Sequence, residues 1–140
     1  DILAGQLLGK LIWQQTHVMY ADFDYIVPIP LHWTRKIVRG YNQADEIAQE
    51  FAVLANRPVL ALLKRTHKTM YQAALTAQER KKNVKHAFDV VDLHKNDIEG
   101  KHILLVDDLM TTGSTLREAA MALLAYKPKQ ISAIVAARVV

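Results

Sequence analysis

One stretch of the chain, residues 103 to 124, most constrains what this sequence can fold into. It opens with an apolar run, 103–106, continues through two adjacent carboxylates, Asp107 and Asp108, and passes into a short loop of hydroxyl and glycine residues. A helical pattern follows at once, because the next apolar side chains keep the i, i+3, i+4, i+7, i+8 spacing. These side chains are Leu116, Ala119, Ala120, Leu123 and Leu124. The predicted order is therefore strand, acidic pair, loop and helix.

That order favours a site for a phosphorylated ligand. A tight loop that opens a helix presents unpaired backbone N–H groups and the positive end of the helix dipole. The carboxylates of Asp107 and Asp108 could accept hydrogen bonds from sugar hydroxyls or hold a divalent metal through oxygen. The structural alternative is a turn or a helix-terminal acid pair, which stabilises by only tenths of a kcal/mol through the dipole. For the loop, the alternative is a simple N-cap, and this does not exclude phosphate binding because both use the same N–H groups.

The other apolar runs do not alternate and are separated by amphipathic helical patterns, which predicts an α/β domain with a mainly parallel sheet buried on both faces. We expect helices at 1–20 and 44–55, the second with Asn42 as its N-cap, and strands at 25–30, 58–63, 87–91 and 131–140, with a turn at 97–101. The length of 140 residues fits one domain spanning 1–140. Ligands bind such sheets outside the carboxyl ends of the strands, so the loops after Pro30 and after Val106 are predicted to face one pocket.

Composition limits the class of protein further. The chain is 51% hydrophobic and 23% charged, as in an ordinary globular domain. No apolar run approaches the roughly 20 residues that cross a bilayer, and the first residues lack the pattern of a signal peptide. There is no cysteine, which excludes disulfides and thiolate metal sites within these residues. We therefore expect a cytoplasmic protein with no membrane span.

The net charge of +4 is unevenly distributed along the chain. Residues 64 to 85 carry seven lysines and arginines against one acid, Glu79, and residues 31 to 40 carry Arg35, Lys36 and Arg39 with no acid. A basic excess confined to two segments indicates an anionic ligand at a defined place more than a diffuse polyanion-binding surface. The alternative is that solvated loops simply carry these charges, a reading that fits Lys81 and Lys82 best.

Three stretches carry a resemblance to a known family. Residues 103–115 resemble the phosphoribosyl-diphosphate (PRPP) binding motif of the type I phosphoribosyltransferases, with its apolar run, acidic pair and small-residue loop all in register. Residues 27–43 resemble the "PxPLH…R…RGxNQ" segment of the competence protein F (ComF) family, and residues 65–88 resemble that family's "R…Q…L…R…N…AF" segment. The family also implies an N-terminal cysteine-rich zinc-binding segment, which the absence of cysteine indicates is lacking here.

The resemblance implies a fold, a ligand and a set of site residues. The fold would be a three-layer sandwich with a central parallel sheet, flanking helices and a long mobile loop. Asp107 and Asp108 would accept from the ribose hydroxyls of PRPP, with Mg²⁺ bound through PRPP and through these two carboxylates. The residues that would hold the ribose and the 5′-phosphate are Asp107, Asp108, Met110, Thr111, Thr112, Gly113, Ser114 and Thr115. Those that would contact diphosphate are Leu31, His32, Arg35, Arg39, Arg80 and Asn83, of which Arg80 joins the two acids as catalytic.

Several functional alternatives stay open on the sequence alone. The main hypothesis is an enzyme, a phosphoribosyltransferase that passes the phosphoribosyl group of PRPP to a nitrogen nucleophile and releases diphosphate in nucleotide metabolism. The second is a non-catalytic component of DNA uptake, with DNA or the competence machinery as partner, and the third is a domain that senses PRPP or a related phosphorylated sugar or nucleotide. A homodimer is open in each case. Trp33 and Tyr41 could stack on a base, whereas Trp13 fits a packing role better, and no residue identifies the acceptor base.

Overall fold

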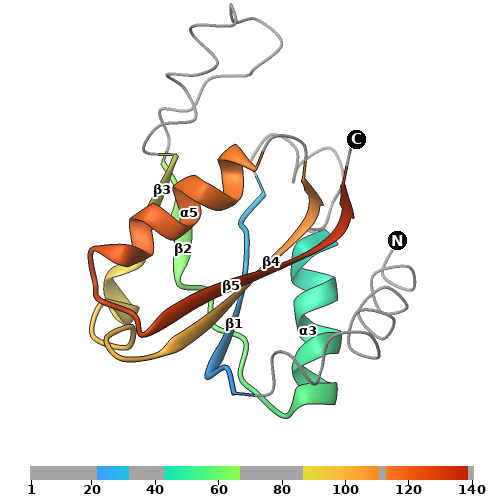
Figure 1. The fold of residues 1–140 in the computed structure, drawn as a ribbon, viewed down its shortest axis with the longest axis horizontal. Coiled ribbons are helices and arrows are strands. Elements are labelled where there is room, and N and C mark those ends of the chain that lie inside the picture. Colours follow the sequence, from blue (N-terminus) through green and yellow to red (C-terminus); the bar gives the residue numbers. More distant parts are fainter. Residues whose placement is uncertain (1–21, 32–42, 67–86, 111–112, 139–140) are drawn as a thin grey trace, which may run out of the picture.

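The computed structural model describes residues 22–31, 43–66, 87–110 and 113–138, and the ribbon in Figure 1 follows their path. The elements in chain order are β1 (Tyr25–Pro28), α3 (Gln43–Ala55), β2 (Leu63–Arg65), β3 (Phe88–Val90), the 3-10 turn η2 (Asp92–His94), β4 (His102–Met110), α5 (Ser114–Leu124) and β5 (Gln130–Arg138). The helix predicted for residues 1–20, the N-cap predicted for Asn42 and the aromatic residues Trp13, Trp33 and Tyr41 lie outside the described residues.

A parallel sheet in the order β1-β4-β5 forms the centre of the domain. Tyr25 of β1 pairs with Ile103 of β4, and the register continues to Pro28 and Val106. On its other side, β4 pairs with β5 from His102 to Met110. The prediction of a mainly parallel sheet is confirmed. Since all three strands run the same way, the exits of β1 and β4 lie at one edge of the sheet, and their entrances lie at the opposite edge.

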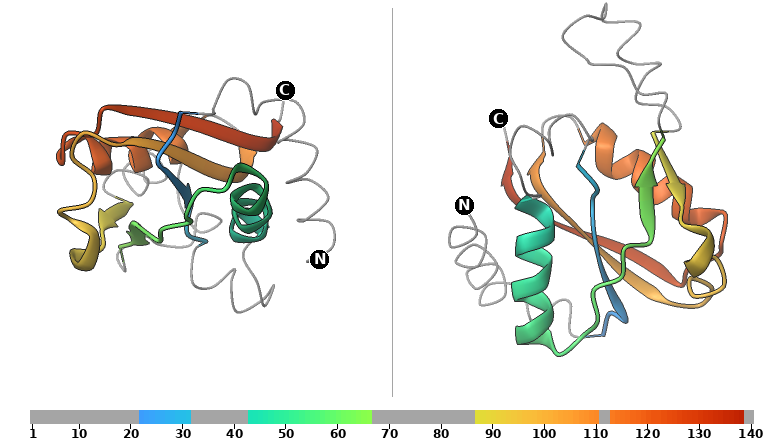
Figure 2. Two further views of the ribbon diagram at one scale, coloured as in Figure 1. Left: turned by 90° about the horizontal axis from the view of Figure 1, so that it is seen from below. Right: turned by 180° about the vertical axis from the view of Figure 1, so that it is seen from behind.

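Helices cover both faces of this sheet (Figures 1 and 2). The buried strand residues divide between the two faces in alternation. Ile103 and Leu105 of β4 belong to an apolar cluster that includes Ala119 and Leu123 of α5. Leu104 and Val106 of β4 belong to a second cluster on the other face. The members of that second cluster on α3 are Ile47, Ala48 and Phe51. A period of two along a strand produces this division, and burial on both faces explains why the run is apolar throughout.

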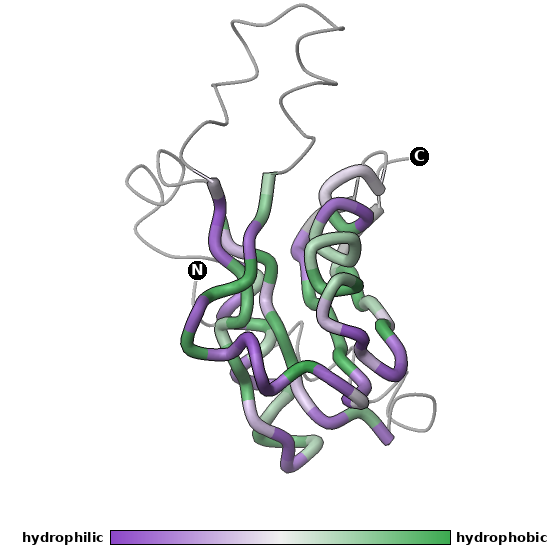
Figure 3. The backbone as a smooth tube through the Cα atoms, turned by 90° about the vertical axis from the view of Figure 1, so that its left-hand side faces the viewer, coloured by the Kyte–Doolittle hydropathy of each residue, from purple (hydrophilic) through white to green (hydrophobic). Residues whose placement is uncertain are grey.

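The apolar pattern of the sequence follows this layering closely. In Figure 3 the hydrophobic stretches run through the interior strands, and the hydrophilic stretches lie mainly in the connecting turns. The helix predicted at 44–55 is confirmed as α3, with Ala44 buried in addition to the three core residues above. The face predicted for α5 is narrower than expected, because Leu124 is 58% exposed. Leu123 in the same turn is fully buried, so the side of the helix that packs on the sheet includes Leu123 and leaves Leu124 toward solvent.

The apolar run 58–63 was expected to be a strand, and the structure corrects this. Val59 makes one isolated parallel bridge to Ile26, after which the chain leaves the parallel sheet. The strand that follows is β2, which pairs antiparallel with β3 as a separate two-stranded ribbon. Leu62 and Leu63 are buried in the same cluster as α5, so burial against the core, more than pairing in the parallel sheet, accounts for the apolar run. An apolar run of six residues does not by itself distinguish these two uses.

The amino edge of the sheet is closed by a polar cluster around His102, the first residue of β4. The imidazole is 4% exposed, and its Nε2 lies 2.8 Å from the hydroxyl of Ser132 on β5. Its backbone N–H donates to the carboxylate of Asp24 at 2.8 Å, and the N–H of Asp24 donates back to the carbonyl of His102 at 2.8 Å. The ring of Phe23 packs edge-on against the imidazole with the centroids 6.5 Å apart. These contacts join the segment before β1 to the start of β4.

Candidate functional site

The acidic pair lies within strand β4, close to its carboxyl end, and not in the loop that follows it. The sequence predicted that the strand would stop before the carboxylates, whereas β4 continues to Met110. The reason is that β5 keeps pairing with it, with Asp107 opposite Val135 and Met110 opposite Arg138. The strand therefore holds both carboxylates on a rigid backbone at the carboxyl edge of the sheet, where ligands bind in this class of fold.

Asp107 is an unusual residue for the interior of a sheet because it is a carboxyl group only 8% exposed. Its Oδ1 accepts a hydrogen bond from the backbone N–H of Asp108 at 2.9 Å. Burial and the adjoining carboxyl of Asp108 raise the pKa of Asp107 to about 6, against the opposing effects of that N–H group and of the Arg65 guanidinium. A buried acid with a raised pKa is in an environment that favours a cation or a hydrogen-bond donor as partner.

The exit of β1 runs directly beside this pair. The N–H of Ile29 donates to the carbonyl of Val106 at 2.8 Å, so the chain after β1 stays attached to the residue that precedes Asp107. Pro30 and Leu31 follow and are half-buried. The structure thus brings Leu31, a residue predicted to contact diphosphate, to the same edge as the acidic pair. The two loops thus leave neighbouring parallel strands, whereas the expectation that they face one pocket falls largely on residues outside the described ranges.

Helix α5 begins at the same edge. Its N-cap is Gly113, whose φ of 82° and ψ of 0° place it in the left-handed region that favours glycine. A glycine cap brings no side-chain acceptor to the first turn, and no acid stands in that turn. The first N–H groups of α5 and its positive dipole end therefore suit an anion. Ser114 and Thr115, predicted to hold a phosphate, form the start of the helix and are half-buried.

Arg65 is the residue that sequence reasoning missed. It ends β2, and its Nε donates to the carbonyl of Pro30 at 2.8 Å, which brings a cation to the exit of β1. The sequence contained a signal, since Arg65 opens one of the segments that resemble the ComF family, but no role was assigned to it there. Seven of the predicted site residues, two of them in the loop before α5, lie outside the described part of the chain. These are His32, Arg35, Arg39, Arg80, Asn83, Thr111 and Thr112.

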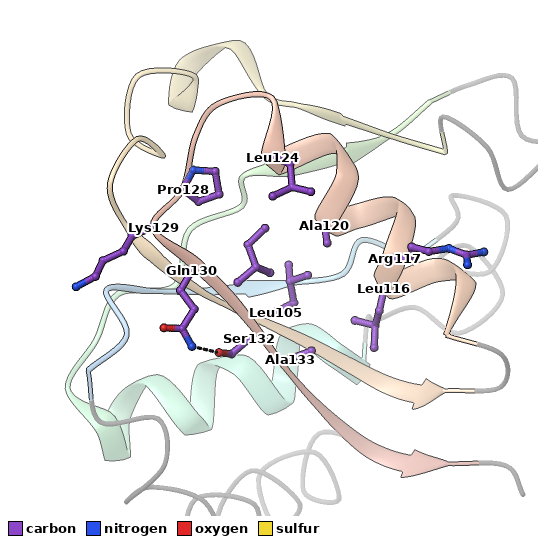
Figure 4. Close-up of a pocket in the computed structure, with 11 residues that line it drawn as sticks. Leu105, Leu116, Arg117, Ala120, Leu124, Pro128, Lys129, Gln130, Ser132 and Ala133 are labelled. Atoms are coloured by element: carbon purple, nitrogen blue, oxygen red, sulfur yellow. Dashed lines mark hydrogen bonds between the residues drawn. The ribbon is translucent and has the colours of Figure 1, made fainter.

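A separate groove of about 440 Å³ lies between α5 and β5 (Figure 4). Its lining is mostly apolar, and Figure 4 shows Arg117 and Lys129 toward its opposite ends. Leu105, which faces α5 in the core, forms part of its floor. Leu116 and Arg117 in the first turn of α5 line the groove, whereas the acidic pair does not. The groove therefore adjoins the start of α5 but does not include the carboxylates of the candidate site.

The described residues also bear on metal binding and on membrane insertion. No group of three or more histidine, aspartate or glutamate side chains there could hold a metal ion by itself. No helix within the same ranges is long and apolar enough to cross a membrane.

The fold and this edge together define a class of protein. A parallel sheet with helices on both faces, an acidic pair at the end of a central strand and a glycine-led helix start describe the type I phosphoribosyltransferase fold. Two solved structures share it. The chain superposes on a structure described as the allosteric regulatory enzyme of purine biosynthesis with a TM-score of 0.65 and 19% identity, covering 95% of this chain and 25% of that one. Phosphoribosylpyrophosphate synthetase from Mycobacterium smegmatis gives 0.58 and 21%, covering 93% and 33%.

Comparison of sequences narrows the class to a family. The phosphoribosyl transferase domain family matches residues 38–139. Competence protein F of Haemophilus influenzae is 41% identical over 96 residues, which cover 68% of this chain and 42% of that protein. DNA utilization protein YhgH of Salmonella typhi is 38% identical over 123 residues, 87% and 52% of the two chains. Competence protein ComFC of Bacillus subtilis is 35% identical over 109 residues, 76% and 41%.

This chain therefore belongs to the phosphoribosyl transferase domain family and, within it, to the competence protein F group. It spans less than half the length of the two competence proteins, so what those longer proteins do does not pass directly to it.

Proposed function

We propose that the chain binds PRPP together with Mg²⁺ and transfers the phosphoribosyl group to a nitrogen nucleophile, releasing diphosphate. The observation that supports this most is the buried acid at Asp107, held on a rigid strand beside the glycine-led start of α5. A sugar that bears phosphates at two positions matches this pairing of acceptors and N–H donors. The carboxylates would accept from the ribose hydroxyls, and the first turn of α5 would bind the 5′-phosphate.

Mg²⁺ fits the chemistry of the site. Asp107 and Asp108 offer the oxygen donors that this ion prefers, and Mg²⁺ is usually held by one or two carboxylates and by phosphates of the substrate. When bound, the ion would neutralise charge on the diphosphate. The chain's own share is positioning, since the strand and helix would fix the ribose and the 5′-phosphate while the C1–oxygen bond breaks.

In the proposed reaction the diphosphate leaves with the electron pair of the bond to C1, and the nitrogen lone pair forms the new bond. The nitrogen nucleophile then gives up a proton to solvent. No described side chain is assigned as a general base. The acceptor stays open, in line with the sequence.

Calorimetric titration with Mg²⁺ and PRPP tests the proposal. We expect the double variant D107N/D108N to lose affinity about 100-fold, because two charge-assisted hydrogen-bonding groups are removed. D89N is the matched control, since Asp89 is an exposed acid on β3 away from the site, and it should bind like the wild type. Wild-type protein that shows no heat at millimolar ligand would overturn the proposed function.

A second candidate is favoured by the names of the relatives, which refer to competence and to DNA utilization. In that case the basic segments would bind DNA phosphates, and the fold would act without catalysis or as a PRPP sensor. Binding to DNA would weaken steeply as salt rises, because counterions are released from the phosphates. A gel-shift series at several salt concentrations, on wild type and R80A, separates the two: salt-dependent binding that R80A weakens, with no PRPP heat, supports the second candidate.

A further inference from the structure

Arg65 connects three elements that are far apart in the sequence. Its Nε donates to the carbonyl of Pro30 at 2.8 Å, across 35 positions of the chain. Its guanidinium carbon lies 4.8 Å above the centre of the Phe88 ring on β3. One face of the guanidinium is thus held by an aromatic ring while its edge holds a backbone carbonyl. Lysine would reproduce this arrangement only in part, because its single ammonium lacks the planar group that can stack on the ring while its edge donates to the carbonyl.

The carbonyl that accepts from Arg65 lies where the chain leaves the parallel sheet after β1. Pro30 is the second residue after β1, and Leu31 follows it. The N–H of Ile29 is already fixed to Val106, next to Asp107. The bond from Arg65 therefore fixes the Pro30–Leu31 peptide, two peptides further along, where the chain begins to leave the sheet. Leu31 is one of the residues that the resemblance assigns to diphosphate, and its backbone N–H belongs to this peptide.

The bond to Pro30 also brings the charge of Arg65 to the strand exit that lies beside the acidic pair. Strand β1 pairs with β4 up to Val106, and the N–H of Ile29 continues this attachment to Val106, which directly precedes Asp107. Arg65 therefore lies at the exit of β1, next to the strand that carries the two carboxylates.

We infer that Arg65 is a positioning residue which sets the Pro30–Leu31 peptide in place relative to the acidic pair and thereby favours a sugar with diphosphate on C1 over the same sugar without it. The inference rests on the proposed function. Ribose 5-phosphate would use the acidic pair and the start of α5, neither of which depends on the bond to Pro30. PRPP would in addition use the backbone at Leu31, which does.

The experiment compares two ligands on four proteins. Affinities for Mg²⁺–PRPP and for ribose 5-phosphate are measured by calorimetry on wild type, R65Q, R65K and K64Q. Lys64 is the neighbouring residue on β2 and is exposed, so K64Q is the matched control for loss of one positive charge. We expect R65Q to weaken PRPP binding about tenfold and ribose 5-phosphate binding less than about threefold, with K64Q unchanged for both. R65K should restore less than half of the lost affinity, expressed on a logarithmic scale.

Comparison of the two ligands separates a specific effect of Arg65 from a general loss of structure. An equal loss of both ligands in R65Q would show a structural role only, and full rescue by R65K would show that charge alone matters; either overturns the inference. If R65Q does not fold, F88L, which removes the ring beneath the guanidinium, and R65K carry the same comparison. Wild type that binds neither ligand overturns the proposed function and the inference together, whereas wild-type binding with an unchanged preference in R65Q and R65K overturns the inference alone.

Discussion

Each end of β4 carries a buried polar residue, and the surroundings of these two residues differ. At the amino end, His102 is 4% exposed and is tied to Ser132, while its backbone is tied to Asp24. At the carboxyl end, Asp107 is 8% exposed and lies beside a second carboxyl that raises its pKa. The first arrangement joins strands, and the second keeps an acid in a place that disfavours its charge. The difference is that one end of the strand contributes to stability, whereas the other carries the acids of the proposed ligand site.

The largest effect on stability should come from His102. H102A removes a buried ring, its contact with Phe23 and its hydrogen bond to Ser132, and we expect the free energy of unfolding to fall by about 3 kcal/mol. Urea denaturation monitored by circular dichroism measures this. H94A is the control, because His94 lies on η2 outside the two apolar clusters and should change the free energy by less than about 1 kcal/mol. A loss at His102 no greater than at His94 would remove the contrast between the two ends.

Asp107 should behave in the opposite way. Its raised pKa means that the folded protein holds the proton more tightly than the unfolded chain, so ionisation above pH 6 opposes folding. D107N keeps an acceptor for the Asp108 N–H and removes the charge, so it should stabilise the ligand-free protein by about 2 kcal/mol at pH 8.

At pH 4 Asp107 is already neutral in the folded state, so the same substitution should have almost no effect. Thermal melts at both pH values, with D89N alongside, give the measurement. If D107N is less stable than wild type at pH 8, the claim that ionised Asp107 destabilises the ligand-free protein is wrong.

Two glycines flank β4 and allow a matched pair of substitutions. Gly100 precedes the strand with φ 72°, and Gly113 follows it with φ 82°. An alanine is strained at either position, so G100A and G113A should each lose about 1 kcal/mol of stability in chemical denaturation. Only G113A should also weaken Mg²⁺–PRPP binding, because only Gly113 begins the helix at the candidate site. Equal affinity of G100A and G113A for Mg²⁺–PRPP would show that the start of α5 does not contribute to binding.

The smallest effect is expected at Leu124. The sequence assigned it to the buried face of the helix, whereas the structure leaves it 58% exposed. L124Q should therefore change the free energy of unfolding by less than about 0.5 kcal/mol, and L123Q, at a fully buried neighbour, by several times more. Chemical denaturation of both variants and of wild type measures the two losses. Similar losses would mean that Leu124 is buried like Leu123, as the sequence predicted.

Much of the fold and part of the site follow from local patterns. Non-alternating apolar runs predicted a parallel sheet, and spacing predicted α3 and α5, because burial on both faces of a strand and on one face of a helix leaves a mark in the sequence. The order of strand, acids, glycine loop and helix predicted where a phosphorylated sugar would bind. Pairing with β5 extends β4 past the acids, and no local pattern contains that information. The use of 58–63 as a buried connection was missed for the same reason.

The sequence by itself determined the class of fold, the acidic pair and the glycine at the start of α5, since each depends on residue types within one continuous segment. Only the tertiary structure decided that Asp107 is buried enough to raise its pKa and that Arg65 reaches Pro30. Both depend on contacts between segments tens of positions apart, and burial and electrostatics act through space. The chain order therefore identified the acidic pair, and packing showed which cation acts on it.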